Sequence, residues 1–192
     1  KDFNAMRLLL ASSFEIINLN RNAEQIISNP RRTNPYFMKF LKMRLSLQDS
    51  LKNDNDILEE LKKLLEDYPK KKEIKILLAD KYRSKKLFTE SIKLYSQIID
   101  NEPFQNKWSI FYSRGIAFER LNKWEKAESD LKMAMKLKPD DPYVINYLAY
   151  SWLDRKKNIE EALDLLEKAV ELEPMDGYIL DSLGWAYYLS DF

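Results

Sequence analysis

Small and apolar residues recur along this chain with a period near 34 residues. From Gly115, an aromatic residue follows after three positions, small residues after twelve and nineteen, and a proline after twenty-four. From Ala79 the aromatic residue, the first small residue and the proline recur at the same offsets, with Ile98 at the nineteenth position, and from Ala149 the whole series repeats with one extra residue. A fixed period of this length is the pattern of a repeat protein. With the small residue numbered as position 8, the units begin at residues 4, 38, 72, 108, 142 and 177, which are 34, 34, 36, 34 and 35 residues apart.

Each unit has the pattern of two helices joined by a short turn. Apolar residues recur at helical spacing on both sides of position 15, where Asn18 and Asn122 can take the left-handed conformation that ends a helix. The proline at position 32 stops the second helix, because it has no N–H to donate. Asn34-Pro35 and Asp141-Pro142 fit an N-cap followed by proline in the first turn. We therefore expect no strands, and paired helices about 14 residues and 21 Å long that begin near the six unit starts.

Small side chains are expected at positions 8, 20 and 27, where the helices pack most closely. The first two units depart from this pattern at Pro30, Leu45 and Ile57, which leaves their helix boundaries less well defined. The predicted repeat-core residues are Ala11, Ala79, Gly115, Ala127, Ala134, Ala149, Ala162, Ala169 and Gly184.

The small-residue and proline pattern resembles the tetratricopeptide-repeat family over nearly the whole chain, best in units 108–141 and 142–176. The resemblance implies an all-α fold, a right-handed α-solenoid of helix-turn-helix repeats over residues 1–192. Segments 111–142 and 145–188 are similar to long bacterial multi-repeat proteins of this family, several of which are membrane-tethered adaptors of the cell envelope. The expected units of this single solenoid are 4–37, 38–71, 72–107, 108–141, 142–176 and the partial unit 177–192.

Composition argues against most catalytic and metal sites. The chain has no cysteine, no histidine and three glycines, so thiol chemistry, histidine ligands and a glycine-rich phosphate loop are excluded. The carboxylate pairs Glu59-Glu60, Asp140-Asp141 and Glu160-Glu161 are interpreted as helix surface and caps, because nothing marks a pocket around them. The oxygen-rich run 53–56 is interpreted as a turn. We expect no enzyme activity, no cofactor and no metal.

Charge is balanced overall but uneven along the chain. Thirty-two basic and 31 acidic residues leave a net charge of +1, which argues against a nucleic-acid partner. Residues 62–86 hold ten basic and four acidic residues, whereas residues 140–192 hold four basic and twelve acidic residues. The basic stretch around Lys70, Lys71 and Lys72 is either ordinary repeat surface or a docking site for an acidic partner.

The resemblance implies that positions 2, 5, 9, 12 and 13 of each first helix face a concave groove. Aromatic residues with polar atoms suit recognition surfaces, although the same rings can instead pack between helices. A carboxylate clamp of lysine and asparagine is not met, since Lys42 is followed by Ser46 in one unit and the next offers Ile76 and Asp80. The predicted partner-binding residues are Tyr112, Tyr143, Asn146, Tyr150, Tyr178, Asp181, Trp185 and Tyr188, with Glu119 and Arg120 nearby.

These observations predict a scaffold or adaptor that holds another protein or a peptide segment in its groove. The alternative is a spacer or self-assembly module whose function lies in other segments. The last helix carries Leu180, Leu183, Gly184 and Tyr187 on one face. Because part of this apolar face is expected to stay uncovered, we predict that the chain self-associates through it. No apolar run is long enough to span a membrane. The chain starts without methionine, so we expect both ends to be cut ends, and the compartment stays open between bacterial cytoplasm and cell envelope.

Overall fold

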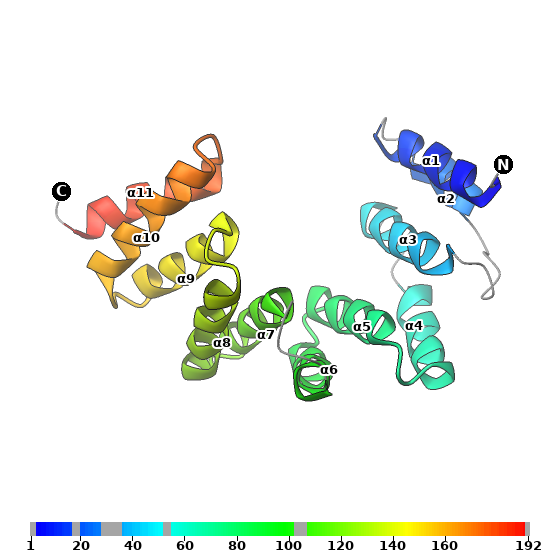
Figure 1. Cartoon of the computed structure of the whole chain (residues 1–192), viewed down its shortest axis with the longest axis horizontal. Helices are drawn as coiled ribbons and strands as arrows, with labels where there is room; N and C mark the ends of the chain where they lie inside the picture. Colours follow the sequence, from blue (N-terminus) through cyan, green and yellow to red (C-terminus); the bar gives the residue numbers. More distant parts are fainter. Residues whose placement is uncertain (1–2, 17–19, 28–35, 52–54, 102–106, 191–192) are drawn as a thin grey trace. The chain divides into compact units, whose positions relative to one another are not determined.

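The computed structural model describes residues 3–16, 20–27, 36–51, 55–101 and 107–190, and within these ranges all regular structure is helical. The helix of residues 108–120 packs against that of residues 124–137, and the helix of residues 142–154 against that of residues 159–172, each pair joined by a short turn (Figure 1). The helices are α1 (Phe3–Ile16), α2 (Asn20–Ile27), α3 (Phe37–Leu51), α4 (Asn55–Asp67), α5 (Lys72–Ser84), α6 (Phe88–Asn101), α7 (Trp108–Arg120), α8 (Trp124–Leu137), α9 (Pro142–Asp154), α10 (Ile159–Leu172) and α11 (Gly177–Leu189).

The predicted repeat register is confirmed. The first helix of each unit is an odd-numbered helix, and each begins within one residue of its predicted start. The structure places these starts at Phe3, Phe37, Lys72, Trp108, Pro142 and Gly177. The chain therefore has an all-α helical-repeat fold, and the two units with irregular small-residue positions keep the same period as the others.

The chain divides into two compact units, Lys1–Leu78 and Ala79–Phe192, with the boundary inside α5. In the first unit, Ala11, Ala23, Phe40 and Leu47 from α1, α2 and α3 form a buried cluster. The Arg7 guanidinium lies 5.2 Å from the Phe40 ring centroid, and its Nε donates a 3.0 Å hydrogen bond to the Ile26 carbonyl. The prediction of a single solenoid over residues 1–192 stays a prediction.

The second unit has a larger core that runs through α7, α8, α9, α10 and α11. Trp152 of α9 is fully buried at its centre, and its indole Nε1 donates a 3.0 Å hydrogen bond to Glu128 of α8. Phe118, Leu131, Leu148, Leu166 and Ala186 belong to the same buried cluster. One continuous core therefore holds the last two complete repeats and α11 in place.

Position 15 takes the left-handed conformation after α5, α7 and α9, which confirms the prediction for Asn122. The φ angle is 61° at Lys86, 55° at Asn122 and 52° at Lys156. At the middle turn, Lys123 N donates to the Phe118 carbonyl at 2.9 Å, which closes the end of α7. Asparagine indicated only one of these three turns, since lysine is not a residue that favours this conformation. Asn18 lies outside the described residues.

Two helix starts in the second unit carry side-chain caps. The Asp141 carboxylate accepts a 3.2 Å hydrogen bond from Val144 N, with Pro142 as the first residue of α9, which confirms the predicted cap. The Asp176 carboxylate accepts from Tyr178 N at 2.9 Å and from Ile179 N at 3.1 Å, and so caps α11. The predicted cap at Asn34-Pro35 lies outside the described residues.

The residue at position 8 is buried where the two helices of a unit pack against each other. A Cβ built on Gly115 would lie 3.0 Å from Leu131 Cγ of α8, so even a methyl group there would be tight. The other buried members of the predicted repeat core are Ala11, Ala79, Ala127, Ala134, Ala149, Ala162 and Ala169.

The prediction for Gly184 is wrong. Gly184 is exposed, and no atom lies within 4 Å of a Cβ built there. The reason is that α11 is the last helix among the described residues, so no second helix of its unit packs against it. The buried face of α11 is instead formed by Ile179, Ser182 and Ala186, which the sequence analysis did not select.

Candidate functional site

Five aromatic side chains of α9 and α11 are exposed at the predicted groove positions. Both helices pack into the core through other residues, since Ile145 and Leu148 of α9 and Ile179 of α11 are fully buried. Large aromatic side chains are normally drawn into the core, so a group of them left outside it is informative. We call this group the aromatic face; it consists of Tyr143 (52% exposed), Tyr150 (47%), Tyr178 (85%), Trp185 (42%) and Tyr188 (70%).

Trp185 and Tyr188 of α11 form a stacked pair within the aromatic face. Their ring centroids are 5.5 Å apart and their planes differ by 21°, so the two rings are stacked. Asp181 lies one turn before Trp185, is exposed, and has no ion-pair partner among the described residues. A stacked pair of exposed rings beside a solvated carboxylate offers a flat apolar surface with a negative edge.

Tyr143 of α9 lies in a negatively charged environment. The carboxylate of Asp176 raises the pKa of Tyr143, and partial burial, Glu173 and Asp141 raise it further. A neighbouring negative charge disfavours the phenolate, which is why the direction is upward. Three carboxylates from the loop before α11 and the start of α9 therefore act on one exposed tyrosine.

Tyr112 and Asn146 belong mainly to the packing between helices. The Tyr112 ring of α7 meets the Tyr147 ring of α9 edge to face, with centroids 5.7 Å apart, and burial raises the pKa of Tyr112. Asn146 is half-buried, and its Oδ1 accepts no hydrogen bond from any described residue. Of the eight predicted residues, these two lie deepest, and Tyr147 is the aromatic neighbour that the sequence analysis missed.

Glu119 joins α7 to α9. Its carboxylate accepts a 3.0 Å hydrogen bond from Arg155 Nη2 and a 3.5 Å hydrogen bond from the Tyr147 hydroxyl. Burial and the Glu119 charge raise the pKa of Tyr147 to about 12. Arg155 also lies 4.2 Å from the Trp124 ring centroid, so its charge is committed within the fold. Arg120 is 3.7 Å from Glu119 and mostly exposed.

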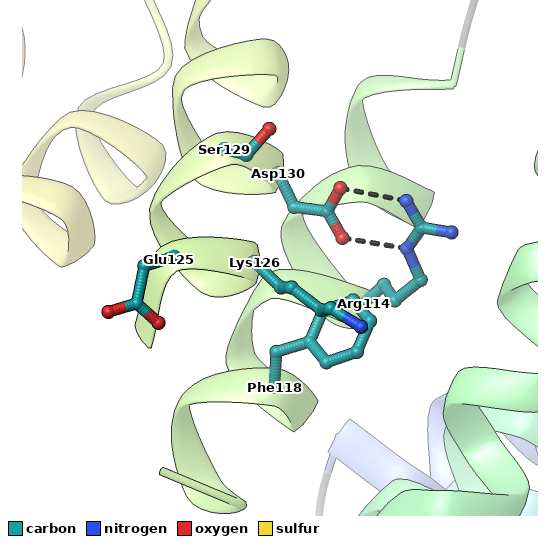
Figure 2. A pocket seen from close by; sticks show the side chains of 6 residues that line it. All are labelled: Arg114, Phe118, Glu125, Lys126, Ser129 and Asp130. Atoms are coloured by element: carbon teal, nitrogen blue, oxygen red, sulfur yellow. Dashed lines mark hydrogen bonds and ion pairs between the residues drawn. The ribbon is translucent and has the colours of Figure 1, made fainter. Parts of the chain in front are cut away.

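A separate pocket of about 390 Å³ lies between α7 and α8, lined by Arg114, Phe118, Glu125, Lys126, Ser129 and Asp130. Figure 2 shows the two parallel bonds from Arg114 to Asp130, 2.7 and 2.8 Å long, while the Glu125 carboxylate points away from them. The third guanidinium nitrogen of Arg114 donates to Ser96 Oγ of α6 at 2.9 Å. Burial raises the pKa of Asp130 and the Arg114 bonds lower it, with burial the larger effect. All three nitrogens of Arg114 thus bind other helices, and this pair is best understood as a structural link.

The carboxylate pairs that the sequence analysis assigned to surface and caps lie in such places. Glu60 forms a 3.0 Å ion pair with Arg44, and Asp140 forms one of the same length with Lys168. Asp141 caps α9. Of the oxygen-rich run 53–56, residues 53 and 54 lie outside the described residues, and α4 begins at Asn55. Within the described ranges no three acidic side chains form a group suited to a metal ion. None of the described helices is both long and apolar enough to cross a lipid bilayer.

Comparison with known proteins relates the chain to solved structures. No family model matches it, and no curated protein matches it. A thermophilic tetratricopeptide-repeat protein from Thermus thermophilus is similar over 98% of this chain and 99% of its own, with a TM-score of 0.72 and 22% identity. A tetratricopeptide-repeat protein from Parabacteroides merdae covers 97% of this chain and 73% of its own, with a TM-score of 0.70 and 15% identity. MamA from Desulfovibrio magneticus RS-1 covers 92% and 98%, with a TM-score of 0.68 and 14% identity.

Proposed function

Because the chain has the tetratricopeptide-repeat fold, we propose that it is a protein-interaction scaffold that holds an extended segment of a partner protein in the concave groove of its repeats. The observation that carries the proposal is the aromatic face. Its five rings lie on two consecutive first helices, at the positions that the repeat directs toward the groove. Stacked repeats present an extended surface of this kind to elongated partners.

Physical chemistry favours these rings as the main contact. Tyrosine and tryptophan bury a large apolar area with little loss of side-chain freedom, and each keeps a polar atom for a hydrogen bond. Such residues contribute most of the binding energy at many interfaces. The principal partner surface of this proposal is on α9 and α11, and the partly buried Tyr112 and Asn146 are its further predicted contacts.

We also propose a second association surface on α11. Leu180 and Tyr187 are exposed on this helix, together with Gly184, and Leu183 is only partly buried. The Tyr187 hydroxyl donates a 2.9 Å hydrogen bond to Glu167 of α10, which holds the ring beside this strip. An apolar strip of this kind is suited to a second copy of the chain. A spacer or assembly module is the alternative function, and self-association without partner capture would favour it.

Partner capture by the full-length protein tests the proposal. Tyr150→Ala and Trp185→Ala remove rings from the aromatic face, and each is expected to weaken capture by about 1–2 kcal/mol, roughly five- to thirtyfold. Tyr68→Ala is the matched control, because Tyr68 is equally exposed but lies beyond the end of α4. Helical circular dichroism should be the same for all three variants.

Two other outcomes would redirect the assignment. If both ring variants capture the partner normally while charge reversal at Lys70, Lys71 and Lys72 abolishes capture, the basic stretch is the binding site.

For the second surface, light scattering after size-exclusion chromatography should show an associated wild type and a monomeric Leu180→Ser variant. A monomeric wild type at all concentrations would contradict self-association through α11.

A further inference from the structure

The aromatic face lies in the most acidic part of the chain. Residues 140–192 hold twelve acidic and four basic residues, a net charge of −8. Two of the four basic residues are already paired, Arg155 with Glu119 and Lys168 with Asp140. The other two, Lys156 and Lys157, lie in the turn between α9 and α10. Asp141 forms a 2.7 Å ion pair with Lys138 of the preceding repeat, but most of the negative charge around α9 and α11 is not neutralised within residues 140–192.

Several of these carboxylates lie beside the exposed rings. Asp176 caps α11 through the Tyr178 and Ile179 amides and acts electrostatically on Tyr143, together with Glu173 and Asp141. Asp181 lies on α11 between Tyr178 and Trp185, exposed and without an ion-pair partner among the described residues. The capping Asp176 and Asp181 within α11 thus lie on either side of Tyr178 in the sequence, so negative charge and aromatic rings occur together at this helix.

Exposed aromatic rings next to carboxylates favour a partner segment that carries positive charge. The face of an aromatic ring attracts a cation, by more when the cation is partly desolvated, and tryptophan does so best. A nearby carboxylate adds Coulomb attraction and repels acidic segments, which sets partner choice and the rate of association. A purely apolar segment would gain the ring contacts but would have to cover Asp181 without neutralising it, at a desolvation cost.

We infer that the segment bound on the aromatic face is an extended peptide carrying lysine or arginine side chains, which lie over the exposed rings and pair with the Asp181 and Glu173 carboxylates. This inference rests on the proposed function, because it names the partner chemistry of the same surface. The charge of residues 140–192 and the exposure of all five rings supply the complementarity.

The direct test is fluorescence anisotropy on the full chain with three labelled twelve-residue peptides. The basic probe repeats Ser-Arg-Ser-Lys three times, the neutral probe repeats Ser-Gln-Ser-Asn, and the acidic probe repeats Ser-Glu-Ser-Asp. The basic probe is expected to bind at least about tenfold more tightly than the neutral one at low salt, with the acidic probe weakest. Equal binding of the basic and neutral probes would overturn the inference.

Matched variants separate a specific site from general attraction to an acidic protein. Asp181→Asn removes one charge from the aromatic face, whereas Asp164→Asn removes one charge from the exposed side of α10. Only the first is expected to weaken the basic probe, by about fivefold. Tyr178→Leu should weaken it similarly and Tyr178→Phe should not, because phenylalanine keeps the ring. If the two aspartate variants weakened binding equally, the basic probe would be attracted by the net charge of the protein and not by a specific site on the aromatic face.

Competition with the captured partner distinguishes the two levels of the proposal. If the basic probe displaces the partner, both the scaffold function and the inferred basic partner segment are supported. If partner capture depends on Trp185 but the basic probe neither binds nor competes, the scaffold function stands and the inferred partner chemistry is wrong. If neither the partner nor the probe responds to changes on the aromatic face, the proposed function itself fails.

Discussion

Gly115 and Gly184 occupy the same position of their repeats but have opposite surroundings. In the pair formed by α7 and α8, a Cβ on Gly115 would meet Leu131 at 3.0 Å. On α11, a Cβ on Gly184 would meet nothing within 4 Å. A small residue at position 8 is therefore needed only where a second helix packs against it. A glycine at this position affects stability through packing in the first repeat but not in the second.

The contrast extends beyond glycine. The pair of α7 and α8 is held by a buried core and by the Arg114–Asp130 bonds, whereas α11 has Ile179, Ser182 and Ala186 buried and Leu183 and Leu189 partly buried. The pair of α7 and α8 is thus constrained by packing, whereas the exposed sides of α9 and α11 carry aromatic rings. Four predictions test this difference, beginning with the largest expected effect.

Removing the Asp130 carboxylate should be the most damaging change. Asp130→Ala leaves the Arg114 guanidinium in a largely buried place without its two short bonds. Breaking one side of a buried ion pair typically costs about 3 kcal/mol or more. Urea unfolding should show this loss, while Asp164→Asn on the exposed side of α10 should stay within about 0.5 kcal/mol of wild type. A loss of less than about 1 kcal/mol for Asp130→Ala would show that the pair is not a structural link.

Enlarging position 8 in the covered pair should force α7 and α8 apart. Gly115→Leu adds four carbons where a single Cβ already lies 3.0 Å from Leu131. Overpacking of this kind typically costs about 1–3 kcal/mol. The loss should spread mainly to the adjacent repeats, which hydrogen exchange can locate. An unchanged melting curve would contradict the close packing at this position.

Alkaline pH should destabilise the fold through Tyr147, which packs α9 against Tyr112 and Glu119 of α7. In the unfolded chain a tyrosine ionises near pH 10, but in the folded chain Tyr147 holds its proton to about pH 12. Between these values the unfolded state binds fewer protons, so the free energy of unfolding falls as pH rises, by at most about 1.4 kcal/mol per pH unit for this group. Tyr147→Phe should make the fall between pH 10 and 12 less steep, whereas Tyr188→Phe on α11 serves as the exposed control. An identical slope for wild type and Tyr147→Phe would contradict the assignment.

The smallest effect should have the opposite sign. Gly184→Ala places a methyl group in open space within a helix, where alanine is favoured over glycine by about 0.5–1 kcal/mol. The melting temperature should rise slightly, while Gly115→Ala should not rise, because its methyl group contacts Leu131. If both alanine variants were equally stabilising, position 8 would not distinguish the two helices.

Local residue chemistry was enough to predict the repeat. The small residues, the position-15 asparagine at Asn122 and the Asp141-Pro142 cap each act within a few residues of the chain, so their pattern predicts helix starts to within one residue. The exposure of Tyr143, Tyr150 and Trp185 agrees with their positions in the repeat, whereas their role in partner binding stays a prediction.

Tertiary structure decided what those side chains meet. Tyr112 and Tyr178 occupy groove positions in their repeats, yet Tyr112 packs against Tyr147 and Tyr178 is almost fully exposed. The Arg114–Asp130 link, the charge of Asp176 beside Tyr143 and the open space at Gly184 likewise depend on neighbours from other helices. A periodic sequence by itself determines where helices begin and which face turns inward. Burial, pKa and exposure depend on whether another helix covers that face, and only the three-dimensional arrangement determines that.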